Sequence, residues 1–411
     1  MEQLVKKYSD KLVQAKLADN TGLSQPLVGG LDDGLIWNRS AEESALLEDV
    51  FKGLNINSLI FLRPREPYGS LIGFLAENAL KSTHKSFGLI QPKDCETRTF
   101  LHDLPVINAF SADQIIQALK KRKSVIIAPQ NNNKDFKGPA IIAHGSVSPE
   151  QGFVTISSVC FAGFIKFFTD YLEALQKGAA FADAHDLFDT IIPYTVPAQR
   201  KLPKLISSPF PDEKTVYSAI IEAGKKTIEY DLVDSYFGNI SYFWNDTLYI
   251  SQTASSLDEL SGCIDPVPMN GSTSAGLTAS SELTAHLETV SRTGCKAILH
   301  GHPKFSVILS MDCDPVEKAA CNFKEYCQIK CPKKRFVGCT PIVPGEVGTG
   351  PFGLCNTLPT ALEQTNSAIV YGHGLFTIGK NNFSEAFATM MEVEELCRNT
   401  YFEKIRCLRK T

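Results

Sequence analysis

The chain has 411 residues, of which 43% are hydrophobic and 21% charged, and its formal net charge at pH 7 is −4. This length is too great for one typical core and predicts two globular domains. The small negative charge gives no electrostatic reason to expect nucleic acid or an acidic membrane as a partner. No apolar run reaches the roughly 18 residues that cross a bilayer, and the first residues are polar, so we expect a cytoplasmic protein.

The first half contains two patterns that each predict a helix followed by a buried strand. Residues 40–50 (SAEESALLEDV) have helical spacing of apolar residues and lead past Gly53 to an apolar strand within 57–67. Residues 118–130 predict a helix end, a turn and a second buried strand. A long helix is predicted over 157–175, where apolar residues dominate.

The same patterns recur in the second half, in the same order. Residues 280–290 (SSELTAHLETV) match the first pattern at Ser, Glu, Ala, Leu, Glu and Val without a gap. Residues 361–373 match the second pattern at Ala-Leu, Ser and Ile, and 383–399 predicts another long helix. Two matches in one order predict a duplicated domain.

A proline-rich stretch, 196–214, predicts a linker between a first domain at 1–195 and a second domain at 215–411. The second domain is expected to begin with a helix over 212–232 and a hairpin over 238–251. The order of helices and strands predicts an α/β fold. We expect a central mixed or antiparallel sheet covered by helices in an α/β/α arrangement, present twice.

Cysteine is the unusual feature of the composition. The chain has 12 cysteines, and half of them fall between Cys313 and Cys355. Their spacings include no CxxC pair, and without a secretory signal a disulfide scaffold is not expected. We expect free thiols in a mostly structural insertion at 313–339. The alternative is a second metal or iron–sulfur site.

Three histidines lie at the ends of two predicted strands. His300 and His302 alternate along one strand, so their side chains point to the same face and can chelate one ion. His373 ends another apolar strand, and the glycine after it leaves space at the site. Neutral imidazoles suit zinc, and three protein ligands with an open position are typical of a catalytic metal site.

A carboxylate precedes these histidines in the sequence. Glu282 is predicted in the first turn of a helix, where the helix dipole favours negative charge. The alternative for an isolated glutamate there is a solvated helix-start residue. His286, one turn later on the same face, is expected to be structural.

Four short motifs occur in the order GNIS (238–241), SSE (280–282), HGHP (300–303) and YGHG (371–374), before a long helix. From about residue 215 to 405 the chain resembles the class II aldolase/adducin family, which includes L-fuculose-phosphate aldolases. The resemblance implies that His300, His302 and His373 hold a divalent metal, and we expect this metal to be Zn²⁺. It also implies that Glu282 is the catalytic acid or base. It also implies substrate-phosphate contacts at Gly238, Asn239, Ser241, Thr253, Ser280 and Ser281.

The resemblance implies an aldolase-type lyase that acts on a small, phosphorylated, sugar-like hydroxy-carbonyl compound through a metal-stabilised enediolate. An epimerase, dehydratase or decarboxylase on the same metal site is an alternative, and so is a non-catalytic scaffold as in adducin. Three departures from the family concern the substrate. Phe243 stands where many members have arginine, Ala254 stands where glycine is usual, and the insertion at 313–339 has no counterpart in the sugar-phosphate aldolases.

The first copy is expected to lack the metal. Alignment of Pro67 with Pro303, and of Ser124 with Ser367, puts Pro64, Glu66 and Gln130 where the three histidines stand. Glu42 is then most simply a helix-start residue. His144 falls in a stretch expected to be irregular and outside the matched region. Because family members form four-subunit rings, we expect two chains to form a homodimer that makes a four-domain ring. The first copy would then line the cleft of the second.

Overall fold

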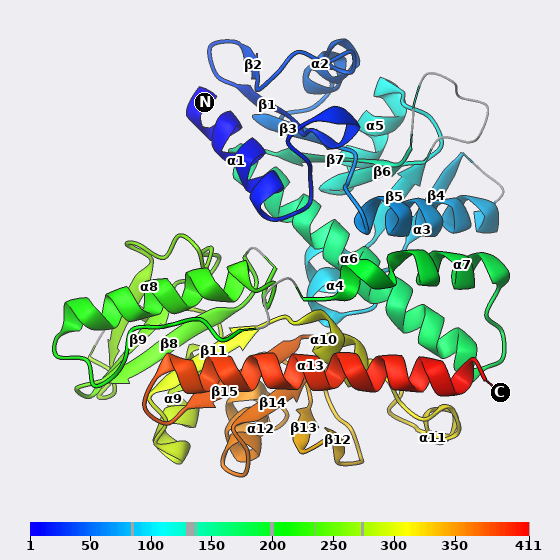
Figure 1. Ribbon diagram of the computed structural model, residues 1–411. Helices are drawn as coiled ribbons and strands as arrows, with labels where there is room; N and C mark the ends of the chain where they lie inside the picture. Colours follow the sequence, from blue (N-terminus) through cyan, green and yellow to red (C-terminus); the bar gives the residue numbers. More distant parts are fainter. Residues whose placement is uncertain are drawn as a thin grey trace. The chain divides into compact units, whose positions relative to one another are not determined.

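The computed structural model of the protein describes residues 1–83, 86–128, 136, 138–197, 201–234, 236–272 and 275–410. The chain divides into two compact units. The first unit comprises Met1–Phe168 and Phe181–Val196, and the second comprises Thr169–Ala180 and Pro197–Thr411. Each unit is built on its own sheet (Figure 1).

The first unit contains a seven-stranded sheet in the order β2-β1-β3-β7-β6-β5-β4. Neighbouring strands are antiparallel except for β5 and β6, which are parallel. The strands are β1 (Leu27–Leu31), β2 (Leu35–Trp37), β3 (Ser58–Leu62), β4 (Phe87–Ile90), β5 (Leu104–Ile107), β6 (Ser124–Ile127) and β7 (Ala140–Gly145).

The second unit contains an eight-stranded sheet in the order β10-β9-β8-β11-β15-β14-β13-β12. Here too all neighbours are antiparallel except one pair, β13 and β14. The strands are β8 (Asn239–Trp244), β9 (Thr247–Ser251), β10 (Ile264–Pro268), β11 (Ala297–Gly301), β12 (Arg335–Val337), β13 (Thr340–Val343), β14 (Ser367–Val370) and β15 (Gly374–Gly379).

The two sheets repeat one topology. Without the edge strand β10, the second order matches the first strand for strand, and the single parallel pair occupies the same place in both. The central pairs also agree in register, because Ser58 is paired with Gly145 in the first sheet and Ala297 with Gly379 in the second. The α/β prediction of a mixed sheet covered by helices and present twice is confirmed.

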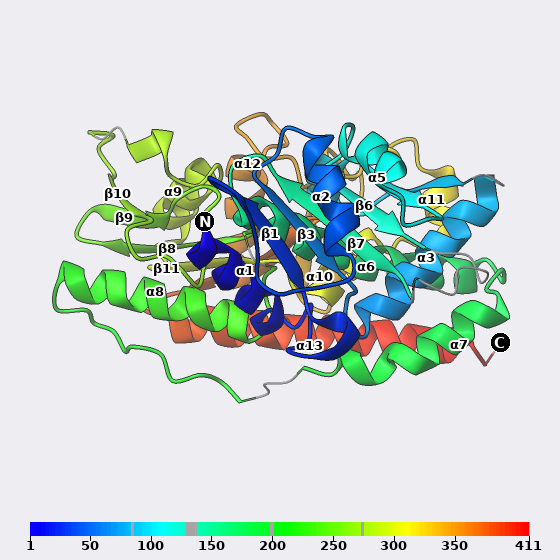
Figure 2. The same ribbon diagram turned by 90° about the horizontal axis from the view of Figure 1, so that it is seen from above.

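Helices cover both faces of each sheet. In the first unit, α2 and α5 cover one face (Figure 2) and bury Leu47, Val50 and Ile115 against the strands. In the second unit, α13 and α8 lie along one face, and α9 and α12 pack together against the other (Figure 1). The first-unit helices are α1 (Glu2–Gln14), α2 (Ser44–Lys52), α3 (Tyr68–Thr83), α4 (Cys95–Leu101), α5 (Ala112–Leu119), α6 (Pro149–Gln176), which runs into the second unit, and α7 (Ala182–Ile191).

The second-unit helices begin after the proline-rich segment. They are α8 (Glu213–Glu229), α9 (Leu283–Thr293), α10 (Lys304–Met311), α11 (Pro315–Ala320), α12 (Leu354–Leu362) and α13 (Phe383–Leu408). Three short 3-10 helices, at Gly22–Ser24, Ile192–Thr195 and Ala275–Leu277, complete the described elements.

Helix α6 departs from the expectation that no segment has membrane-spanning length and composition. Within the described residues it is the one helix that passes this test, but 89% of its apolar window is buried inside the protein. Core helices of soluble proteins pass the same test, so the result is weak evidence for a membrane span. Near its start, Gly152 faces Ile60 of β3 so closely that an added Cβ would lie 3.0 Å from the isoleucine side chain, which fits a core position.

Candidate functional site

The register of three neighbouring strands brings the predicted metal ligands together. His300 lies near the end of β11, between β8 and β15, where it pairs with Asn239 on one side and Phe376 on the other. His302 follows the strand by one residue, and His373 lies in the turn between β14 and β15. The two strand ends that the sequence indicated therefore meet at one point.

The three imidazoles converge through their Nε2 atoms. The Nε2 of His300 lies 3.1 Å from that of His302 and 3.3 Å from that of His373, and all three side chains are buried. In a tetrahedral zinc site with metal–nitrogen distances of about 2.0–2.1 Å, two nitrogens lie about 3.3–3.4 Å apart. The spacing therefore fits three ligands of a single ion. In the part of the chain that the structure describes, no other three His, Cys, Asp or Glu side chains come this close together.

The protonation of these histidines also suits a metal. Burial, with the neighbouring imidazoles, holds the pKa of both His300 and His302 well below the ordinary histidine value. The Nδ1 of His300 faces the carbonyl oxygen of Leu375 at 3.3 Å, so it carries the proton and leaves the Nε2 lone pair directed at the cluster. Phe376 stacks on the His300 ring with the centroids 3.9 Å apart and fixes its plane.

Gly374 permits the close approach of β15 to the histidines. A Cβ at this position would lie 2.4 Å from the carbonyl oxygen of Gly301 and 2.7 Å from ring atoms of both His300 and His302. Carbon atoms do not approach backbone oxygens this closely, so a side chain at residue 374 would push the strands or the rings apart. The glycine after His373 is therefore required for the histidine geometry.

Glu282 stands beside the histidine cluster. It is the N-cap residue of α9, directly before the helix, and its side chain makes no capping hydrogen bond. Its carboxylate is buried, with Oε1 3.5 Å from Nε2 of His373 and Oε2 3.7 Å from Nε2 of His300. The carboxylate is therefore directed toward the histidine cluster instead of serving the helix terminus.

A buried hydrogen-bond chain holds this carboxylate. The Nδ2 of Asn239 donates to Oε2 of Glu282 at 2.6 Å, and the Oδ1 of Asn239 lies 2.6 Å from Nε2 of His286. Because an amide oxygen can only accept, His286 carries its proton on Nε2. Its Nδ1 then accepts from the hydroxyl of Ser241 at 2.7 Å. Burial lowers the pKa of His286 to about 3, so the imidazole is neutral and can both donate and accept.

His286 was predicted to be structural, and its hydrogen-bond connection to Glu282 was not predicted from the sequence. Its distance of one helical turn from Glu282 was visible in the sequence. Its connection to Glu282 runs through Asn239 on β8, which is far away in the sequence and is brought close only by the packing of the folded domain. A histidine at i+4 from a candidate catalytic glutamate was the one available signal.

The six predicted phosphate contacts have different surroundings. Asn239, Ser241 and Ser280 are buried next to Glu282, and the Ser280 hydroxyl accepts a hydrogen bond from the Glu282 backbone at 3.3 Å. Gly238 has a φ of +93°, and a Cβ there would lie 2.6 Å from the carbonyl oxygen of His300, so only glycine fits. The remaining two, Thr253 and Ser281, have exposed side chains.

One departure from the family has a clear local geometry. Ala254 follows Thr253 with a φ of +56°, which is the left-handed region that glycine adopts without strain. The backbone therefore keeps the conformation for which glycine is suited, although the residue is alanine.

The first sheet carries different residues at the corresponding positions. The matched register of β3 and β11 aligns Phe61 with His300 and Arg63 with His302. This corrects the alignment by proline, which had placed Pro64 and Glu66 there. Gln130 lies outside the described residues. His144, expected in an irregular stretch, lies on β7 instead.

Arg63 is enclosed by partners of its own. Its guanidinium forms a 2.8 Å ion pair with Glu43 and lies 4.9 Å from the ring centre of Phe61 and 4.8 Å from that of Phe136. Both members of the ion pair are largely buried. A cation held by a carboxylate and two aromatic rings therefore stands where the second sheet has a histidine cluster.

Comparison with known proteins finds a family match in the second half of the chain. Residues 218–401 match the family model for the Class II Aldolase and Adducin N-terminal domain. The second half of this chain is a class II aldolase/adducin domain. The first copy, outside the matched residues, is related to it here by its strand order and register.

Solved structures resemble about half of this chain at low identity. L-fuculose-1-phosphate aldolase from Thermus thermophilus is 20% identical, with 47% of this chain and 96% of that chain covered and a TM-score of 0.36. YgbL from Klebsiella pneumoniae, an aldolase/epimerase/decarboxylase candidate, is 20% identical over 47% of this chain and 91% of its own, with a TM-score of 0.37. No curated protein matches the chain.

Proposed function

We propose that the second domain is a metal-dependent lyase of the aldolase type that acts on a small hydroxy-carbonyl compound. The observation that supports this most directly is the set of three converging Nε2 atoms with a buried carboxylate beside them. A protein that used the domain only as a scaffold would have no need for four buried, mutually directed polar side chains, because burying them is costly without a partner.

The metal and the carboxylate would have separate tasks. A divalent ion held by His300, His302 and His373 would supply Lewis-acid stabilisation of negative charge that develops next to a substrate carbonyl. Glu282 would move the proton at the reacting carbon. Asn239 holds Oε2 of Glu282, so we assign proton transfer to Oε1, the oxygen 3.5 Å from His373.

Phosphate recognition, if the substrate carries a phosphate, would rest on fewer side chains than the family resemblance implies. Asn239 and Ser241 are already joined in the chain that holds Glu282. Backbone N–H groups next to Gly238 and the exposed hydroxyls of Thr253 and Ser281 are the groups that we propose for this task. An unphosphorylated hydroxy-carbonyl compound would require only the metal and Glu282.

Metal analysis and an activity screen together test the proposal. Purified protein is expected to hold about one divalent ion per chain at this site, and His302→Ala is expected to release it because two ligands rarely retain zinc. Retro-aldol cleavage would be followed with phosphorylated and unphosphorylated ketoses and with hydroxy acids. Protein that binds no divalent ion in any preparation would disprove the enzymatic assignment. Metal-dependent epimerisation or decarboxylation without cleavage would reassign the reaction at the same site.

A further inference from the structure

The cysteine-rich insertion lacks the burial that stabilises the rest of the second unit. We define the cysteine insertion as residues 312–336, which leaves out Val337 to Cys339 of the insertion predicted at 313–339 because Val337 is buried. None of its 25 residues is buried, and its large side chains Val316, Tyr326 and Phe336 are more than half exposed. Apart from the short helix α11 and the first residues of β12, it consists of turns and irregular chain. A segment of this kind cannot be held by hydrophobic burial and normally needs covalent or metal cross-links.

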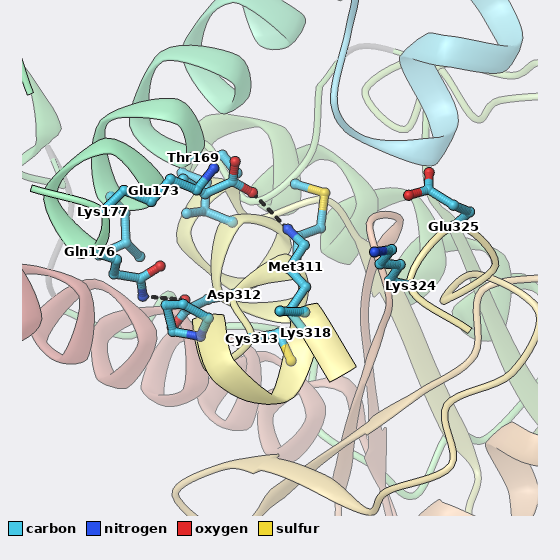
Figure 3. A pocket seen from close by; sticks show the side chains of 14 residues that line it. Thr169, Glu173, Gln176, Lys177, Met311, Asp312, Cys313, Lys318, Lys324 and Glu325 are labelled. Carbon is cyan, nitrogen blue, oxygen red and sulfur yellow. Dashed lines mark hydrogen bonds and ion pairs between the residues drawn. The ribbon is translucent and has the colours of Figure 1, made fainter. Parts of the chain in front are cut away.

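The insertion is attached to its own unit by polar contacts and by its last residues: Asp312 forms a 2.8 Å ion pair with Lys404, and Arg335 and Phe336 join the sheet in β12. A pocket of about 280 Å³ lies between the last turns of α6 and the start of the insertion, with Cys313 and Lys318 in its wall (Figure 3). Lys318 crosses to Glu173 in a 2.9 Å ion pair, and Lys333 pairs with Glu317 within the insertion at 2.5 Å. Partly exposed ion pairs of this type contribute little to stability. These contacts do not replace an apolar core for the irregular chain between Asp312 and β12.

Four thiols are gathered in this otherwise coreless segment. Cys313, Cys321, Cys327 and Cys331 are all free and only partly exposed, in contrast with Cys339 outside the insertion, which is exposed. Cys327 interacts electrostatically with both Cys321 and Cys331, and Cys313 interacts with both Cys327 and Cys331. The four sulfur atoms therefore form one connected group.

The backbone between these cysteines is organised around their sulfur atoms. The N–H of Phe323 donates to the Sγ of Cys321 at 3.4 Å, and the Sγ of Cys327 faces the carbonyl oxygens of Phe323 and Lys324 at 3.6 and 3.5 Å. Both thiols are thus in contact with the backbone of the same turn. Burial raises the pKa of Cys313 and Cys327, whereas the positive charge of Arg335 lowers it for both. The effect of burial is the larger, so the pKa of both thiols lies above its ordinary value.

We propose that Cys313, Cys321, Cys327 and Cys331 are the ligands of an iron–sulfur cluster, which forms a second metal centre in this domain. Each thiol would lose its proton and form one iron–sulfur bond, as in other cysteine-ligated clusters. The cluster would supply the cross-link that the cysteine insertion lacks. Basic residues on both sides of Cys331 would balance the negative charge of the thiolates: Lys330 before it and Lys333, Lys334 and Arg335 after it.

The spacing of the thiols favours a cluster over a single zinc ion. With zinc–sulfur bonds of about 2.3 Å, the sulfur atoms of one tetrahedral ion lie about 3.8 Å apart. Within the described chain, no three of these sulfur atoms lie within 4.8 Å of one another. A cluster of several iron atoms spans a wider set of sulfurs.

Anaerobic purification of the full chain tests the proposal. We expect about two or about four iron atoms per chain with an equal amount of acid-labile sulfide, and a broad absorption band near ~400 nm. Cys327→Ser and Cys331→Ser should each lower the iron, the sulfide and the band at least about fivefold, whereas Cys339→Ser, the matched control, should leave all three unchanged. His302→Ala should release the histidine-bound ion without loss of the band, so the test is independent of the proposed function.

Two results would overturn the proposal. One is anaerobic wild-type protein without iron and sulfide, which needs no variant and is therefore not affected by misfolding. The other is zinc, in place of iron, that disappears in Cys327→Ser and Cys331→Ser. Electron paramagnetic resonance of the reduced wild-type protein gives a second measurement, because a cluster yields a signal and a zinc site does not.

Discussion

The side-chain amide of Asn239 donates a 2.6 Å hydrogen bond to Oε2 of Glu282, and its oxygen accepts from His286. The orientation of the glutamate therefore depends on a residue from another strand and on a histidine one turn along its own helix. Replacement of either partner would leave a buried polar group without its hydrogen bond.

His286→Leu is expected to lower turnover by about 10–100-fold while the bound metal and the Michaelis constant change little, because Glu282 keeps its place but loses its fixed orientation. His286→Gln provides the control, since its amide can still donate to Asn239 and should restore most of the turnover. Measurement of kcat, KM and metal content in both variants checks this. Equal turnover in His286→Leu and wild type would assign His286 to packing alone.

The same histidine predicts a pH dependence of stability. Its pKa is about 3 in the folded protein, well below the ordinary value of 6.5, so unfolding takes up a proton in the interval between them. The contribution of neutral His286 to stability is complete above pH 6.5 and is lost as the pH falls toward 3. Between pH 7 and pH 5 this amounts to about 2 kcal/mol of unfolding free energy.

Denaturant unfolding at both pH values, in wild type and His286→Leu, isolates this contribution. Other buried histidines titrate in both proteins, so only the difference between the two pH dependences reports on His286. A shallower dependence in His286→Leu is expected. Parallel pH dependences would show that His286 titrates normally in the folded protein.

Glu282→Gln is expected to keep the fold and the bound metal but to lose proton exchange with solvent at the carbon next to the substrate carbonyl. The loss should be about 10²–10⁴-fold, the usual contribution of a general acid or base. Glu288→Gln, an exposed position on the same helix, serves as the control. Exchange would be followed by NMR in deuterated buffer, and unchanged exchange in Glu282→Gln would mean that another residue moves the proton.

Gly374→Ala is expected to weaken metal binding at least about tenfold, because the new methyl group would collide with the rings of His300 and His302. Gly350→Ala is the control, since a Cβ there meets no atom within 4 Å. Metal affinity would be measured by competition with a chelator. Wild-type affinity in Gly374→Ala would show that the strands adjust without disturbing the ligands.

Much of the fold was predictable from the sequence, because the same pattern of helices and strands occurs in both halves of the chain. Matched segments at 40–50 and 280–290 predicted the duplication, and the apolar strands predicted the sheets. The hairpin predicted over 238–251 is present as β8 and β9. The pairing of the parallel neighbours β5–β6 and β13–β14 and of the edge strand β10 was not predictable, because it depends on contacts between distant segments. The alignment of the first copy by its prolines was wrong by three residues, since Pro64, not Pro67, lies at the position of Pro303.

The part of the candidate site that depends on the geometry of a single strand was predictable. Histidines two residues apart on a strand must share a face, and the structure brings His300, His302 and His373 together as expected. The hydrogen-bond partners of Glu282 were not predictable, because they depend on how β8 and α9 pack. The substrate, the dimeric ring and the cytoplasmic location stay predictions.

Because Arg63 forms a buried ion pair with Glu43, it would be difficult to introduce a histidine cluster into the first copy. Replacement of Arg63 by histidine alone would remove the cation 2.8 Å from Glu43 and supply one ligand where a metal needs three. Phe61 would also have to change, and each single step would disturb a packed arrangement before it gave any affinity for an ion. The first copy therefore cannot gain a histidine cluster through single substitutions that each improve metal binding.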